Sequence, residues 1–272
     1  MTIRDEVTEP RKPYLQEVAE SFWFFLKPSN ATTFVVMIVY SVFIFGMLGA
    51  FRHTRIPLAH GFGRGRGLAV TFLVMAAGYL CAYYIAVIKE AAAGEDELPN
   101  PWPTTNPTWE LAIEALYFVG TTVWVLLPTI VYMCIEYAHF GQITWPIAAF
   151  VAILGLMLWP AAVLCASISG NINDLWPMIL LRTALAEPLA YLVTCMVMLL
   201  AVGLCSLPYT DFYQSTAEAI TDNLGTIASL LLFIFQVALT TYAMFVSMRV
   251  IGLYYRHFKQ EFPWTTKPSN KE

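Results

Sequence analysis

The sequence predicts an all-α protein, a polytopic membrane bundle of about six transmembrane helices. The 25 residues from Leu224 to Met248 include no charged side chain, and comparable apolar stretches recur along the chain. Because a helix rises ~1.5 Å per residue, ~20 apolar residues cross the hydrocarbon core of a bilayer. The chain is 58% hydrophobic and only 12% charged, whereas soluble domains have ~25% charged residues. Lipid is therefore the expected solvent of these helices.

The apolar runs place the six spans along the chain. We expect them at about 31–51, 68–88, 108–137, 143–167, 188–206 and 224–256. We expect residues 1–30 to form an N-terminal extension and an interfacial amphipathic helix. Residues 31–258 are expected to form the membrane domain, and residues 259–272 a polar tail. We expect the tail to be disordered from Phe262 onward, as chain ends commonly are.

The interfacial helix is predicted from residue spacing between Tyr14 and Lys27. Apolar side chains recur every three to four residues, and polar ones occupy the opposite side. Trp23 and Lys27 are suited to anchor such a helix in the headgroup plane. Pro28 favours a break before the first span. The apolar side consists of Tyr14, Val18, Phe22, Phe25 and Leu26.

A second short helix is expected before the fifth span. Residues 175–186 are too few to cross a bilayer, and they follow the helix-breaking sequence SISGNINDLWP. We interpret them as a half-helix or re-entrant piece. Asn173 or Asp174 is the expected N-cap, with Pro177 just inside the helix.

Ionisable residues near membrane depth are the usual indicators of function in a bundle of this kind. Asp174, Arg182 and Glu187 gather around the half-helix, and Glu136 lies near the end of the third span. One interpretation is a polar site at a broken helix, as in transporters. The alternative is an ion pair that holds the short helix in place, because the polar groups freed at a helix break need partners within the bilayer.

Two loops carry most of the remaining charge. The first connection contains four arginines, which we expect to contact lipid headgroups: Arg52, Arg55, Arg64 and Arg66. Its GFGRGRG run lacks the spacing of a dinucleotide-binding loop. The acidic residues 95–97 are expected to form a solvated connection. Within the sixth span, Gln236 is predicted to bond a neighbouring helix.

Motifs for catalysis or cofactors do not stand out. The five cysteines form no CxxC pair, and the four histidines fall near span ends or in loops. We therefore expect no metal and no cofactor. The sequence has no GxSxG or HExxH signature, which disfavours an enzyme. It has no basic surplus for nucleic acid.

The distribution of basic residues indicates orientation. With six spans both termini share one side, and that side holds eleven of the fifteen Lys and Arg residues, while the first connection holds the other four. The positive-inside rule then predicts cytoplasmic termini in a bacterial inner membrane. The four arginines of the first connection count against this orientation.

Three separated segments occur in an order that resembles a family of uncharacterised multi-pass bacterial membrane proteins frequent in planctomycetes. They are AVIKEAAAGEDELPNPWPTTNPTWELAIEALYFVG with VLLPTIVY, LWPAAVLCASISGNINDLWPMILLRTALAEPLAYLV, and MRVIGLYYRHFKQEFPW. The resemblance implies the same topology and no particular activity. Members often carry a metal-binding ribbon at the N-terminus, and this chain has no such cysteines.

Together these observations favour a non-catalytic structural or accessory subunit of a membrane complex. Such a subunit would bind lipids and other membrane subunits, or further copies of itself, through its helix faces. The alternative is a small transporter or channel with its site around Asp174, Arg182 and Glu187. A membrane enzyme is the third possibility.

Overall fold

The computed structural model describes residues 12–53, 64–101, 107–210, 213–216 and 225–265. Over these residues the protein is all-α, with no strand, as the sequence predicts. The long helices are α2 (Pro28–His53), α3 (Arg64–Ala93), α4 (Pro107–Phe140), α5 (Trp145–Ser169), α7 (Pro188–Ser206) and α9 (Thr226–Phe258). The short ones are α1 (Tyr14–Ser21), α6 (Pro177–Leu185) and four 3-10 turns, η1 (Phe24–Leu26), η2 (Ile172–Leu175), η3 (Leu207–Tyr209) and η4 (Lys259–Glu261).

Six helices in the described part of the chain are long and apolar enough to cross a membrane. They run over Pro28–Leu48, Val70–Ala93, Leu111–Phe140, Trp145–Ser169, Pro188–Ser206 and Ile227–Glu261. The predicted number and order of spans are confirmed. The chain is accordingly a multi-pass membrane protein with a helical bundle fold.

Both predicted short helices are present, but the start of α6 differs from the expectation. Its N-cap is Trp176, whose backbone is extended (φ −60°, ψ 132°), and Pro177 is the first helical residue. A residue before proline avoids the helical conformation, so the helix cannot begin earlier. Asn173 and Asp174 belong instead to η2, which Asn171 caps by accepting the Asn173 N–H at 3.1 Å.

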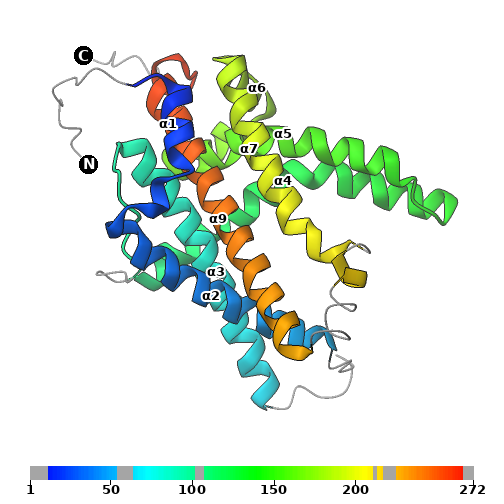
Figure 1. Ribbon diagram of the computed structural model, residues 1–272. Helices are drawn as coiled ribbons and strands as arrows, with labels where there is room; N and C mark the ends of the chain where they lie inside the picture. Colours follow the sequence, from blue (N-terminus) through cyan, green and yellow to red (C-terminus); the bar gives the residue numbers. More distant parts are fainter. Residues whose placement is uncertain (1–11, 54–63, 102–106, 211–212, 217–224, 266–272) are drawn as a thin grey trace.

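Helix α9 runs through the middle of the molecule and contacts α1, α2, α3 and α7 (Figure 1). Its C-terminal half is buried, and Phe245, Met248 and Val250 have no exposed surface. The approach of α3 is close at Gly252, where a Cβ atom would lie 2.5 Å from the Ile88 carbonyl oxygen. Only glycine allows this packing distance, so the core lies around this crossing.

Helices α4 and α5 pack against each other, and their connected ends project away from the rest of the molecule (Figure 1). All residues of α5 from Trp159 to Ser167 are buried. By contrast, Ala148 is the single buried residue among residues 130–154. We call residues 130–154 the arm; this name does not refer to the N-terminal residues 1–30.

The C-terminal residues differ from the expected loose tail. Phe262 has no exposed surface, and its ring stacks on Trp264 with centroids 5.6 Å apart. The Trp264 indole N–H donates to the Thr183 hydroxyl of α6 at 3.1 Å. Aromatic side chains thus fold residues 262–265 back onto α6 and α9, and the expectation of disorder is wrong there. Residues 266–272 of the predicted tail lie outside the described residues.

Candidate functional site

The structure places the predicted polar-site residues on one broken segment without joining them. Asp174 lies in η2, Arg182 in α6, and Glu187 just before α7. Arg182 is exposed, while Asp174 and Glu187 are partly buried. The ion pairs of the described residues do not connect any two of these three. The ion pair that was expected to hold the short helix is therefore not formed.

Glu136 lies in the arm, near the C-terminal end of α4. Its Oε2 atom accepts the backbone N–H of Thr144 at 2.8 Å. The carboxylate therefore closes the turn between α4 and α5.

The arginines of the first connection fall at the edge of the described structure. Arg52 lies in the last turn of α2, and Arg64 and Arg66 lie in the first turn of α3. The side chains of these three, and Arg55 as a whole, lie outside the described residues. Their contact with lipid headgroups stays a prediction.

A charged cluster that the sequence did not indicate lies where α9 passes the loop after α3. The Arg249 guanidinium donates to Asp96 Oδ1 at 2.8 Å and lies 3.7 Å from the centroid of the Phe24 ring. Lys27 approaches the other Asp96 oxygen at 3.4 Å. Arg249 is only 8% exposed. We call Arg249, Asp96, Lys27 and Phe24 the Arg249 cluster.

The cluster affects how Asp96 ionises. Partial burial alone would raise the pKa of Asp96, but its hydrogen bond with Arg249 and the nearby Lys27 charge outweigh burial. The pKa is therefore held below its ordinary value, because both cations stabilise the carboxylate. The Asp96 side chain is 64% exposed, which fits the expected solvated connection, but it also bonds to α9, which the sequence did not indicate.

A buried amide fixes the same loop to the start of α2. Asn30 has no exposed surface, and its Oδ1 atom accepts the Leu98 backbone N–H at 2.8 Å. Its Nδ2 atom donates to the Phe24 carbonyl at 3.2 Å. A buried amide with both ends bonded holds the two segments in one arrangement.

A second set of polar contacts attaches α1 to the end of α9. Glu17 Oε2 lies 3.0 Å from His257 Nε2 and 3.7 Å from Arg256. Tyr14 forms a 2.7 Å hydrogen bond with the Thr194 hydroxyl of α7. These contacts hold the N-terminal helix against the bundle, so its inner side is covered by protein.

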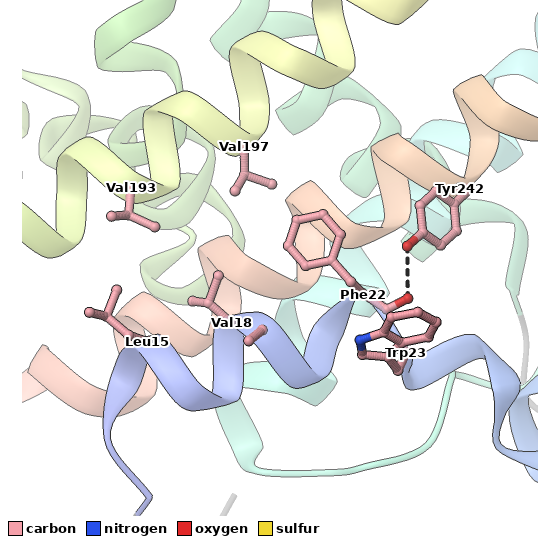
Figure 2. A pocket seen from close by; sticks show the side chains of 8 residues that line it. Leu15, Val18, Phe22, Trp23, Val193, Val197 and Tyr242 are labelled. Carbon is pink, nitrogen blue, oxygen red and sulfur yellow. Dashed lines mark hydrogen bonds between the residues drawn. The ribbon is translucent and has the colours of Figure 1, made fainter.

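Beside these contacts, a groove of about 600 Å³ separates α1 from α7 and α9. Figure 2 shows Leu15, Val18 and Phe22 of the N-terminal segment directed towards Val193 and Val197 of α7. At one end the Tyr242 hydroxyl donates to the Phe22 carbonyl at 2.7 Å. The lining is apolar, so this groove suits hydrocarbon.

A second groove, of about 850 Å³, lies between α4 and the η2–α6 segment. Its wall on α4 is mainly apolar, and two tryptophans and a tyrosine contribute polar atoms. The lining residues are Ile113, Leu116, Tyr117, Gly120, Thr121, Trp124, Asn173, Leu175, Trp176 and Ile179. This groove lies beside the half-helix where the sequence placed its polar site.

Polar groups within the spans bond mostly to the chain itself. Gln236 donates to the Leu204 carbonyl of α7 at 2.8 Å, which confirms the predicted contact between helices. The Tyr191 hydroxyl donates to the Met157 carbonyl at 2.7 Å. All five cysteines are free. Among the described residues, no group of three or more His, Cys, Asp or Glu side chains is placed to hold a metal ion.

Arg249 directly follows the uncharged stretch that ends at Met248, and the sequence analysis assigned it no partner. The signal was present, since apolar residues continue after it from Val250 to Leu253. An arginine followed by another apolar turn is not at the end of a buried helix and needs a partner there. The Lys89–Glu114 pair, 2.6 Å apart, joins α3 and α4 and was missed for lack of any local pattern.

No family model, curated protein or solved structure matches this chain. The fold and site geometry define the class, a multi-pass membrane protein of six candidate spans.

Proposed function

We propose that the chain is a non-catalytic structural or accessory subunit of a membrane complex. In this proposal it resides in a bacterial inner membrane with both termini in the cytoplasm, and its helices bind lipids and another membrane subunit. The observation that carries the proposal is the arm. Large apolar side chains on both of its helices point away from the chain, including Ile135 at 55% and Phe150 at 61% exposed.

The arm suits an apolar helical partner. Its acidic group Glu136 is engaged by Thr144, and most of its large exposed side chains are apolar. Helices in a bilayer associate by van der Waals packing between such faces. Elsewhere in the bundle, polar groups such as Gln236 and Tyr191 bond to neighbouring helices of the same chain, whereas the arm presents mainly apolar side chains, which supports a role in assembly.

The transporter or channel alternative stays a prediction. It requires a polar site around Asp174, Arg182 and Glu187, and the adjacent groove has mainly apolar walls. The resemblance to the planctomycete membrane family supports the topology and implies no activity for either alternative.

The accessory role is tested on the full-length chain extracted with its surrounding lipid in polymer-bounded discs. Native mass spectrometry should find a particle with this chain and a different polypeptide in fixed ratio. Phe150→Ala should lower the fraction of chain in that particle about fivefold, because an exposed arm contact is lost.

The matched control is Phe235→Ala on α9, where the phenylalanine is 65% exposed. That substitution should leave the particle intact. A particle containing only this chain, as a monomer or as several copies, would contradict the accessory role. Equal effects of the two substitutions would mean that the arm is not the part of the chain that contacts the other subunit.

A further inference from the structure

The groove between α4 and the η2–α6 segment has fixed walls. The Trp124 indole N–H donates to the Leu175 carbonyl at 3.1 Å, and the Tyr117 hydroxyl donates to the Gly170 carbonyl at 3.2 Å. Both donors are on α4, and both acceptors lie in the segment that follows α5. These two bonds hold the walls at a set separation, and the space between them, about 850 Å³, falls within the range of small-molecule sites.

Missing side-chain volume on α4 contributes to the opening. Gly120 lines the groove, and a Cβ atom placed there would meet no atom within 4 Å. The chain opposite is a short 3-10 turn followed by a nine-residue helix. Because α5 ends at Ser169, this side of α4 faces the short η2–α6 segment, while α3 packs on another side of α4.

The residues around the groove are of the kinds expected at the boundary between hydrocarbon and headgroups. Just beyond its α4 wall, Glu114 forms a 2.6 Å ion pair with Lys89, and such a pair belongs near the edge of the apolar zone. Trp124 and Trp176 line the groove and are 42% and 65% exposed. Exposed tryptophans are enriched at this depth of a membrane protein.

A cation lies beside the groove. Arg182 is exposed and follows the lining residue Ile179 by three positions, so the two are neighbours on the surface of α6. Arg182 has no hydrogen-bond or ion-pair partner in the part of the chain that the structure describes. The carboxylates in the neighbouring segments do not occupy this position: Glu114 is held by Lys89, and Asp174 and Glu187 do not line the groove.

From this arrangement we infer that the groove binds one anionic phospholipid of the surrounding membrane. An acyl chain lies along Leu116 and Gly120, and the phosphate pairs with Arg182. Arginine matches phosphate because its planar guanidinium donates two parallel hydrogen bonds. This site is independent of the proposed accessory role, because it needs only this chain and lipid.

The test uses the purified full-length chain in discs containing equal amounts of phosphatidylglycerol and phosphatidylcholine with identical acyl chains. Native mass spectrometry counts the lipids that remain bound. The wild type should retain phosphatidylglycerol about fivefold to tenfold over phosphatidylcholine, as expected for a charge-assisted hydrogen bond at an open site. Arg182→Gln should reduce that preference to about twofold or less, and Arg182→Lys should keep part of it.

Two further substitutions separate the groove from general charge effects. Gly120→Leu fills the groove and should lower retention of both lipids at least about threefold, whereas Gly203→Leu, at an equally open glycine of α7, should not. Lys259→Gln removes a positive charge near the same end of the molecule and should leave the preference unchanged. Equal retention of the two lipids by the wild type would overturn the inference, as would an equal effect of Lys259→Gln and Arg182→Gln.

Discussion

The arm and the Arg249 end of the molecule are built from similar apolar helices but are stabilised differently. Around Arg249, segments far apart in the sequence meet: α1, the loop after α3, α6 and the last turns of α9. Tyr254 shows this, since its ring is buried and its hydroxyl donates to the Thr183 carbonyl at 2.8 Å. In the arm, α4 and α5 contact mainly each other.

The difference shows where specificity comes from in a chain surrounded by lipid. Lipid tails are as apolar as leucine, so hydrophobicity alone does not fix how two helices pack. At the Arg249 end, charged pairs, buried hydroxyls and aromatic rings define one arrangement. The arm has few such groups, so its position depends on the packing of its two helices and on whatever surrounds them.

The largest expected effect comes from placing a methyl group at the tightest helix crossing. In Gly252→Ala the new Cβ atom would lie 2.5 Å from the Ile88 carbonyl oxygen and 2.6 Å from the Ala91 Cβ atom. Backbone atoms cannot rotate away, so α3 and α9 must separate. We expect a loss of about 3 kcal/mol in the free energy of unfolding, measured by thermal denaturation in one detergent.

A parallel substitution in the α4–α5 pair sharpens the comparison. In Gly155→Ala the Cβ atom would clash with the Val125 carbonyl oxygen, but the two helices can part locally. Amide hydrogen exchange should rise in α4 and α5 only. Gly203→Ala, at a glycine with no atom within 4 Å, is the control and should be neutral or slightly stabilising. Global destabilisation by Gly155→Ala would show that the α4–α5 pair at the base of the arm is coupled to the core.

The next effect concerns Arg249 and the Phe24 ring that its guanidinium contacts. Arg249→Leu removes the bond to Asp96 and the contact with Phe24 and should cost about 2 kcal/mol of unfolding free energy. Loss of the Nε group, which is buried without a partner, offsets part of that cost. A double-mutant cycle with Phe24→Leu should give a coupling of about 1 kcal/mol. Additive effects would mean that the ring contributes packing only.

These contacts also mark the limit of what the sequence could predict. Span positions, both short helices and the Gln236 contact follow from local composition, because a bilayer imposes length and polarity on each segment separately. The Asp96–Arg249 bond joins residues 153 positions apart, and the Trp264–Thr183 bond joins residues 81 apart. No local pattern specifies such a pairing. Arg182 was predicted for its charge, but the groove beside it depends on how α4 meets η2.

The smallest expected effect is the pH dependence from Asp96. Its pKa lies below the ordinary value in the folded chain, so the carboxylate stabilises the fold above about pH 4, near the pKa of an unfolded aspartate. That stabilisation is lost as the pH falls through the lower, folded-state pKa. The Asp96 side chain is 64% exposed, and screening by water limits the contribution to about 1 kcal/mol or less.

The measurement compares the wild type with Asp96→Asn between pH 7 and pH 3 in a pH-stable detergent. The difference in unfolding free energy should be constant from pH 7 to about pH 5 and should shrink below about pH 4. The remaining carboxylates are the same in both proteins, so their contribution cancels in the difference. A difference that persists unchanged at pH 3 would mean that the asparagine disturbs the loop itself, because protonation of Asp96 in the unfolded chain should by then have reduced the contribution of its charge.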